Sequence, residues 1–155
     1  MKKLLLSLVA ILALAGVALA ANIPSVVDPQ NGPETWLTAV YNNSGSTLDV
    51  GDVVVWDIGS STGDDDNYVT TTTTASTQIV AGVVYPAAIA AASTGSIAIK
   101  GIATCDVNSV GANAMSPLCT STTGGSGTPC TATVGQYAIT TAAISPSSSG
   151  NCFVK

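Results

Sequence analysis

Beyond residue 35 the chain consists of short runs of β-branched and aliphatic residues, each ended within a few positions by Gly, Ser, Asn or Pro. Such runs, bounded by turn-forming residues and lacking a helical period, are typical of β-strands. We expect seven strands, at residues 36–41, 53–56, 68–74, 78–85, 95–105, 131–141 and 152–154. No internal repeat is evident. The pattern predicts an all-β fold, a single small β-sandwich or β-barrel of about seven short strands with a disulfide-stapled C-terminal third.

The first twenty residues have the pattern of a secretory signal peptide. Lys2 and Lys3 precede an apolar stretch over residues 4–17, and Ala18-Leu19-Ala20 supplies small residues for cleavage before Ala21. An uncleaved membrane anchor is the alternative, although the stretch is short for a span. A pilin-type leader is disfavoured because Pro24 would break the helix that should follow.

Three segments follow from this pattern: a signal peptide over residues 1–20, a proline-rich extended arm over residues 21–35 and a β-domain over residues 36–155. Pro24, Pro29 and Pro33 make the arm irregular. Its apolar residues Ile23, Val26 and Val27 are candidates for adding a strand to the open sheet edge of a neighbouring copy.

The sparse charge excludes several classes of function. The sequence has no histidine, so histidine-dependent triads, zinc sites and proton shuttles are excluded. After leader removal two lysines remain against nine carboxylates, a net charge of −7. Such a surface is repelled by nucleic acid and by anionic lipid, so we expect neither as a partner.

All four cysteines lie after the leader, and an even number in an exported chain indicates two disulfides. Three pairings are possible. We prefer Cys119–Cys130, which closes a Gly- and Ser-rich loop, together with Cys105–Cys152, which ties the C-terminal strand to an inner strand. The spacing lacks the close pairs of structural zinc sites and redox motifs.

The densest polar cluster is an acidic loop with Gly59 and Gly63. Calcium prefers several oxygen ligands from a flexible loop, and the candidate ligands are Asp57, Asp64, Asp65 and Asp66. The EF-hand spacing is not matched, and a solvated loop that protects a sheet edge is the alternative. Catalysis by paired carboxylates is disfavoured because Glu34 is the only glutamate and most aspartates lie in turns. We therefore expect no enzyme and no cofactor other than calcium.

The aromatic residues allow two interpretations. Trp36, Tyr41, Trp56 and Tyr85 could stack against a sugar, or they could anchor the core, as Trp56 after three valines suggests. Glycan is therefore a possible ligand. Asn42-Asn43-Ser44 matches the N-glycosylation pattern but also suits a turn.

Between about residues 40 and 104, the chain resembles a β-rich domain of phage capsid-decoration and head-stabilising proteins. The shared sequence pattern consists of the GDVVVWD segment at residues 51–57, a Thr-rich strand, and the VAGVVYPAAIAAASTGSIAIKGIA segment at residues 80–103. The resemblance implies a surface-coating or assembling role without catalytic residues.

Together these features favour a secreted structural subunit that self-assembles into an extracellular filament, sheath or surface layer. A low surface charge weakens the repulsion that keeps proteins monomeric, so we expect a homo-oligomer or polymer. A secreted adhesin or carbohydrate-binding module, with calcium or an exposed aromatic patch, is the alternative.

Overall fold

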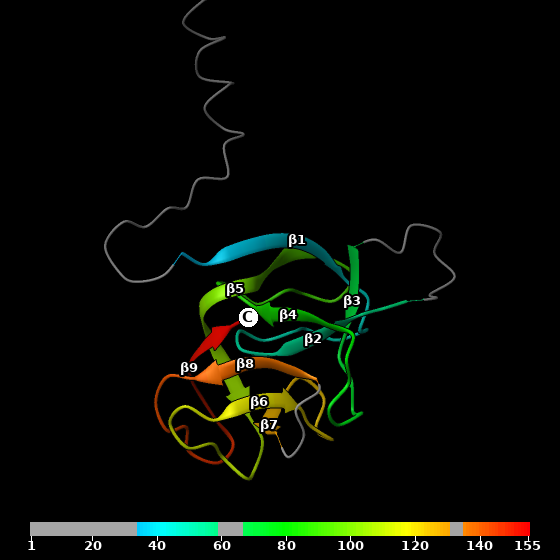
Figure 1. Cartoon of the computed structure of the whole chain (residues 1–155). Helices are drawn as coiled ribbons and strands as arrows, with labels where there is room; N and C mark the ends of the chain where they lie inside the picture. The colour runs from blue at the N-terminus through cyan, green and yellow to red at the C-terminus, as the bar shows by residue number, and fades with distance from the viewer. Residues whose placement is uncertain (1–33, 59–66, 131–134) are drawn as a thin grey trace, which may run out of the picture. The chain divides into compact units, whose positions relative to one another are not determined.

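The computed structural model describes residues 34–58, 67–130 and 135–155, and these residues form an all-β structure (Figure 1). Its nine strands are β1 (Trp36–Asn42), β2 (Val53–Trp56), β3 (Tyr68–Thr70), β4 (Val80–Val84), β5 (Thr94–Val107), β6 (Pro117–Thr120), β7 (Gly127–Pro129), β8 (Gln136–Thr140) and β9 (Ser148–Val154). Within the described residues, no helix has the length and apolar character needed to span a membrane.

The first five strands form a five-stranded mixed barrel, which we call the first ring. The strand order is β1-β3-β2-β4-β5, and pairing between β1 and β5 closes the ring. β1 and β3 are parallel, whereas the other pairs are antiparallel. Only residues 94–100 of the long strand β5 belong to this ring.

The four further strands pair with the second half of β5, residues 101–107, in what we call the second ring. The order is β5-β7-β6-β8-β9, and β5–β9 pairing closes it. Again the first and third strands, β5 and β7, are parallel and the remaining pairs antiparallel. The second ring therefore repeats the topology of the first, with β5 serving as the last strand of one and the first strand of the other.

A register shift and an isolated bridge occur at matching places in the two rings. The β2–β4 ladder shifts register between Val54 and Val55, and the β6–β8 ladder shifts between Leu118 and Cys119. Isolated bridges join Leu48 to Ile89 in the first ring and Ala112 to Ile144 in the second. A shared strand order could arise by chance, but shared bulges and bridges at matching places indicate an internal duplication.

The duplication is visible in the sequence once the strands are aligned. Residues 87–100 and 142–155 share six of fourteen residues at a constant offset of 55, namely the pairs Ala87/Ala142, Ala88/Ala143, Ile89/Ile144, Ser93/Ser148, Gly95/Gly150 and Lys100/Lys155. The expectation of no internal repeat is therefore wrong. The offset changes along the chain because loops differ in length, so no single shift aligns the two halves.

One contact occurs in both rings. A Cβ atom on Gly95 would lie 2.5 Å from Cγ1 of Ile89, and one on Gly150 would lie 2.6 Å from Cγ1 of Ile144. Both glycines therefore make room for the isoleucine of the isolated bridge, and neither is required for its backbone conformation.

This contact gives a stability prediction. Gly95→Ala should lower the free energy of unfolding by about 1–3 kcal/mol, because an added methyl group overpacks a filled site. In the background of Ile89→Ala the same change should cost much less, since the space is then open. Denaturant unfolding of the two single variants and the double variant measures this coupling, and additive effects would contradict the packing account.

The buried apolar residues form two clusters, and strands of the first ring contribute residues to both. One cluster fills the first ring and includes Val54, Val84 and Ile97. The other fills the second ring and extends to Val53 and Ala98, which face it from β2 and β5. Strands covered on both sides become continuously apolar rather than alternating, which explains the run Val53-Val54-Val55.

The strand predictions need four corrections, the first being that the last strand begins at Ser148 instead of residue 152. The Thr-rich strand ends at Thr70 instead of residue 74, because the chain then turns to bond β6: Thr120 Oγ1 donates to the Thr74 carbonyl at 2.9 Å and accepts from the Thr77 N–H at 2.9 Å. β6 and β7 lie in a region expected to be loop. The predicted strand at residues 131–141 begins at Gln136, and residues 131–134 lie outside the described residues.

Candidate interaction surface

The acidic loop is only partly described. The side-chain amide of Asn43 donates to Asp57 Oδ2 at 2.6 Å, and the Asp57 N–H donates to the Tyr68 carbonyl at 2.9 Å. Asp57 therefore fastens the end of β2 to its surroundings. Asp64, Asp65 and Asp66 lie outside the described residues, within which no three or more metal-ligating side chains gather. The calcium site stays a prediction.

A second set of carboxylates, missed from the sequence, lies where the two rings meet. The Asp49 N–H donates to Asp52 Oδ2 at 2.8 Å, and the Asp106 N–H donates to the Gly51 carbonyl at 3.0 Å. Desolvation by burial raises the pKa of Asp52; the Asp49 hydrogen bond opposes this effect, and the charges of Asp106 and Asp49 add to it. Asp106 Oδ1 is buried and has no hydrogen-bond partner in the described part of the chain.

The raised pKa of Asp52 gives a pH prediction. A carboxyl group whose pKa is higher in the folded state binds its proton more tightly there, so stability falls as the pH rises from the unfolded value through the folded value. Asp52→Asn should remove this dependence and raise neutral-pH stability slightly, by less than about 1 kcal/mol, since the group is half exposed. Urea unfolding of both proteins from pH 3.5 to 7 measures the effect; equal pH dependence would contradict it.

The surface of the described residues has several hollows. Three of them have similar volumes of 330–340 Å³. Their ionisable lining side chains are Tyr137 and Lys155 in one hollow and Asp106 in another. Burial, and to a smaller extent the charge of Asp106, raises the pKa of Tyr137, so its hydroxyl keeps its proton. The hollow that contains Asp106 is otherwise lined mainly by serine and threonine residues.

The two tryptophans have different environments. Trp36, at the start of β1, is 53% exposed, and the Lys100 ammonium lies 5.0 Å from its ring centroid. Trp56 is partly buried and packs against the core of the first ring. Tyr41 packs on Tyr68 at 4.8 Å between ring centroids. The sugar-stacking interpretation stays a prediction.

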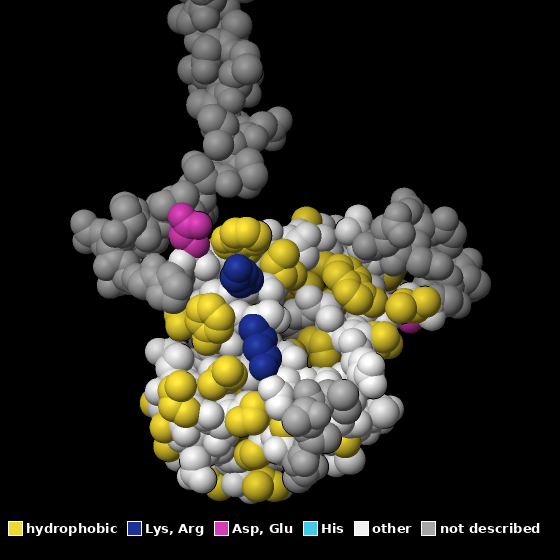
Figure 2. All heavy atoms as spheres, viewed as in Figure 1, with side chains coloured by type: hydrophobic (Ala, Val, Ile, Leu, Met, Phe, Trp, Pro, Cys, Tyr) yellow, Lys and Arg dark blue, Asp and Glu magenta, His cyan; other side chains and the backbone are white. Residues whose placement is uncertain are grey.

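An apolar surface surrounds the start of β1. Leu37 is 39% exposed and follows Trp36 in β1, and Ile99 on the paired strand β5 is 38% exposed. Figure 2 shows the two lysines of the described residues close together on one face, among apolar side chains. We call Trp36, Leu37, Ile99 and Lys100 the β1 patch. It combines exposed apolar area with positive charge, which is scarce in this chain.

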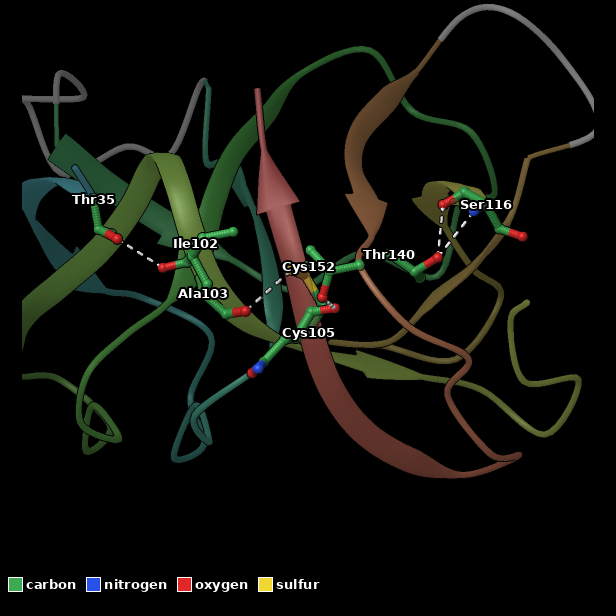
Figure 3. The surroundings of a disulfide bond; sticks show 9 residues. Thr35, Ile102, Ala103, Cys105, Ser116, Thr140 and Cys152 are labelled. Atoms are coloured by element: carbon green, nitrogen blue, oxygen red, sulfur yellow. Dashed lines mark hydrogen bonds between the residues drawn. A yellow bond between two sulfur atoms is a disulfide. The ribbon is translucent and has the colours of Figure 1, made fainter. Parts of the chain in front are cut away.

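The segment that enters β1 is fastened to the second half of β5. The Thr35 hydroxyl donates to the Ile102 carbonyl at 2.7 Å (Figure 3). Gly101 has a positive φ of 103°, and a Cβ atom there would collide with the Glu34 carbonyl oxygen. The predicted assembly residues Ile23, Val26 and Val27 lie before this point, outside the described residues.

Asn42, the acceptor position of the glycosylation pattern, is fully buried. Its side-chain amide donates to the carbonyls of Ser46, Ile89 and Ala90 at 2.7, 2.9 and 3.1 Å, and its oxygen accepts from the Ser44 N–H at 2.9 Å. This residue holds the turn after β1, so the structure favours the turn interpretation over modification of the folded chain.

Both disulfides lie in the second ring and have the pairing preferred from the sequence. Cys105–Cys152 joins β5 to β9 (Figure 3), and Cys119–Cys130 joins β6 to the residue after β7. In the second ring, Cys105 lies opposite Gly150, and in the first ring Val40 lies opposite the matching glycine, Gly95. In the same way, Cys152 lies opposite Ala103 in the second ring, and Ile97 lies opposite Thr38 in the first. The first disulfide thus occupies the place of the buried pair Val40 and Ile97 in the first ring.

Comparison with known proteins supports the fold alone. No protein-family model matches the chain, and no curated protein matches it either. Among solved structures, the chain is similar to the head fiber gp8.5 N base of bacteriophage phi29, with a TM-score of 0.55 and 9% sequence identity. The match covers 77% of this chain and 95% of the phage chain. The chain therefore shares a β-rich fold with the base domain of a phage head fibre.

Proposed function

We propose that the protein is a secreted structural subunit that assembles with copies of itself into a filament, sheath or surface layer outside the cell. The observation that carries this proposal is the β1 patch, where Trp36 is 53% exposed at the point where the arm joins the domain. Large exposed aromatic side chains at such positions are frequent anchors of protein interfaces. The fold shared with a phage head-fibre base agrees with an assembling role.

The charge distribution supports association between copies. Of the nine carboxylates, several lie in or beside turns, whereas the two lysines of the described domain lie close together on one face (Figure 2). A face with most of the positive charge can meet an acidic region of a neighbouring copy. Contacts of this kind between different surfaces repeat from copy to copy and generate extended assemblies.

Sedimentation of the chain from residue 21 onward tests the proposal. We expect large species whose fraction increases with protein concentration, and Trp36→Ser should weaken their formation by more than about 30-fold, as expected for an interface anchor. Val110→Ser is the matched control, since Val110 is 68% exposed in a turn of the second ring. Monomers at every concentration would contradict the proposal.

A carbohydrate-binding module or adhesin is the second candidate. The exposed ring of Trp36 favours it, since such a ring can stack on a sugar face. Quenching of Trp36 fluorescence by a panel of soluble oligosaccharides, with Trp36→Ser as the control, separates this candidate from the structural subunit.

A further inference from the structure

We propose that the outer edge of β1 is the acceptor site for a β-strand donated by residues 25–28 of the N-terminal arm of a second copy. The proposal rests on the proposed self-assembly and names the surfaces that meet in it. Four observations carry it: an open strand edge, a partner already in place at the matching edge of the second ring, the direction in which the arm enters β1, and the local charge.

Among the described residues, β1 is paired on one side only along most of its length. It pairs with β5 from Trp36 to Tyr41, but with β3 only at Tyr41 and Asn42. The Asn42 N–H donates to the Ser93 carbonyl, and the Asn42 carbonyl accepts from the Ala92 N–H. The backbone groups of Asn42 therefore point towards β5. Because backbone groups alternate in direction along a strand, those of Leu37 and Ala39 point the other way, to the open side.

The outward backbone groups of Leu37 and Ala39 have no hydrogen-bond partner within the described residues. Both residues are exposed. An exposed strand edge with unpaired N–H and carbonyl groups is a template for another strand, and apolar side chains such as those of Trp36 and Leu37 increase its affinity.

The second ring shows what such an edge binds. By the duplication, Ile102 is the counterpart of Leu37, and its outward carbonyl accepts the Thr35 hydroxyl at 2.7 Å (Figure 3). Further along the same edge, the Asp106 N–H donates to the Gly51 carbonyl at 3.0 Å. The counterpart of Asp106 in the first ring is Tyr41, which pairs with Tyr68 of β3. The position of Ile102 therefore has a hydrogen-bond partner in the second ring, whereas the matching position, Leu37, has none within the described residues of the first.

The arm is the segment suited to fill this place. Its residues 25–28, Ser-Val-Val-Asp, lie between Pro24 and Pro29, so all four keep the N–H that a ladder needs. The thirteen residues from 21 to 33 span up to about 43 Å when extended, which is enough to reach a neighbouring molecule.

The way the arm enters β1 favours a second copy as the acceptor. Glu34 and Thr35 lie beside Gly101 and Ile102, in line with β1 and not beside its open edge. The arm of the same molecule would have to reverse direction immediately before residue 34 to reach that edge, whereas the arm of another molecule meets no such restriction.

Charge complementarity points to the same place. Asp28 is the one charged residue of the arm before Glu34, and Lys100 lies in the β1 patch over the Trp36 ring. In a chain with a net charge of −7 after leader removal, few sites attract an acidic segment.

Hydrogen exchange of the assembled chain from residue 21 onward tests the proposal. We expect the amides of Leu37 and Ala39, together with those of residues 25–28, to exchange at least about 100-fold more slowly in polymers than in dilute monomers. Polymers in which these amides exchange as in the monomer would overturn this inference and leave the proposed function intact. Protection of β1 without the arm would indicate edge-to-edge pairing of two β1 strands and would also overturn it. Failure to form polymers at all would overturn both.

A proline variant provides a second, independent test. Ala39→Pro removes the outward N–H and leaves the β5 ladder in place, because proline is tolerated where the N–H faces solvent on an edge strand. Ala39→Thr is the matched control, since it retains the N–H. We expect polymer formation to fall at least tenfold in Ala39→Pro and to persist in Ala39→Thr, with both disulfides intact. Equal polymerisation of the two variants would contradict the proposal.

Discussion

Reduction of both disulfides should remove about 7 kcal/mol from the free energy of unfolding. In the chain-entropy model the 47-residue separation of Cys105 and Cys152 contributes about 4 kcal/mol, and the 11-residue separation of Cys119 and Cys130 about 3 kcal/mol. The sum is comparable to the whole stability of a typical domain, so the second ring should unfold under reducing conditions. Circular dichroism in denaturant, with and without reductant, measures the loss.

The duplication supplies a sharp control for this experiment. Cys105→Val together with Cys152→Ile installs the pair found at the matching positions of the first ring, Val40 and Ile97. This variant should be more stable than one with serine at both positions, because it replaces the disulfide by apolar packing and adds no buried hydroxyl groups. Equal stability of the two variants would contradict the correspondence between the rings.

Deletion of residues 21–33 should abolish polymers and leave a folded monomer. The deletion retains Glu34 and Thr35, and therefore the Thr35–Ile102 hydrogen bond that fastens the start of β1. All nine described strands begin after the deleted segment, so the domain should unfold at the same denaturant concentration as the longer chain. Sedimentation and denaturant unfolding of the two chains measure both effects.

A substitution that keeps the length of the arm tests whether its sequence is needed for assembly. Val26→Lys and Val27→Lys together keep all thirteen residues, but they remove the apolar side chains and place positive charge where the donated strand would meet Lys100 of the β1 patch. We expect this variant to behave as the deletion does. Polymers that survive either change would show that the arm has no part in assembly.

Local sequence patterns predicted the strands whose residues carry a strong β signal. β1, β2 and β4 consist largely of valine and aromatic residues between turn-forming residues, and all three lie where expected. β6 and β7 consist of Pro, Leu, Cys, Thr and Gly, and they are strands because distant partners complete their ladders. Pairing of that kind cannot be read from a short window.

The duplication was missed for a related reason. The two halves of the duplication share β5, so no segment boundary separates them. The strongest similarity, at residues 87–100 and 142–155, lies mainly in turns and at a few apolar residues. The disulfides conceal it further, because Cys105 and Cys152 replace an aliphatic pair. The duplication became evident from bulges and bridges rather than from residue identity.

The interaction surface was predictable only in part. The sequence singled out the arm and both tryptophans, but it could not tell that Trp36 is exposed while Trp56 packs on the core. Exposure of the Trp36 end depends on how far β3 extends along β1, and that strand is only three residues long. The carboxylates near Gly51 were missed because Asp52 and Asp106 are far apart in sequence and meet only where the rings join.

Negative-stain electron microscopy of the protein, taken directly from the exterior of the producing cell, tests the central claim most directly. Self-assembly through the arm and the β1 patch predicts regular fibres, tubes or lattices whose repeat accommodates a domain of this size. Isolated small particles, in material concentrated well above the level at which the chain is secreted, would contradict the claim.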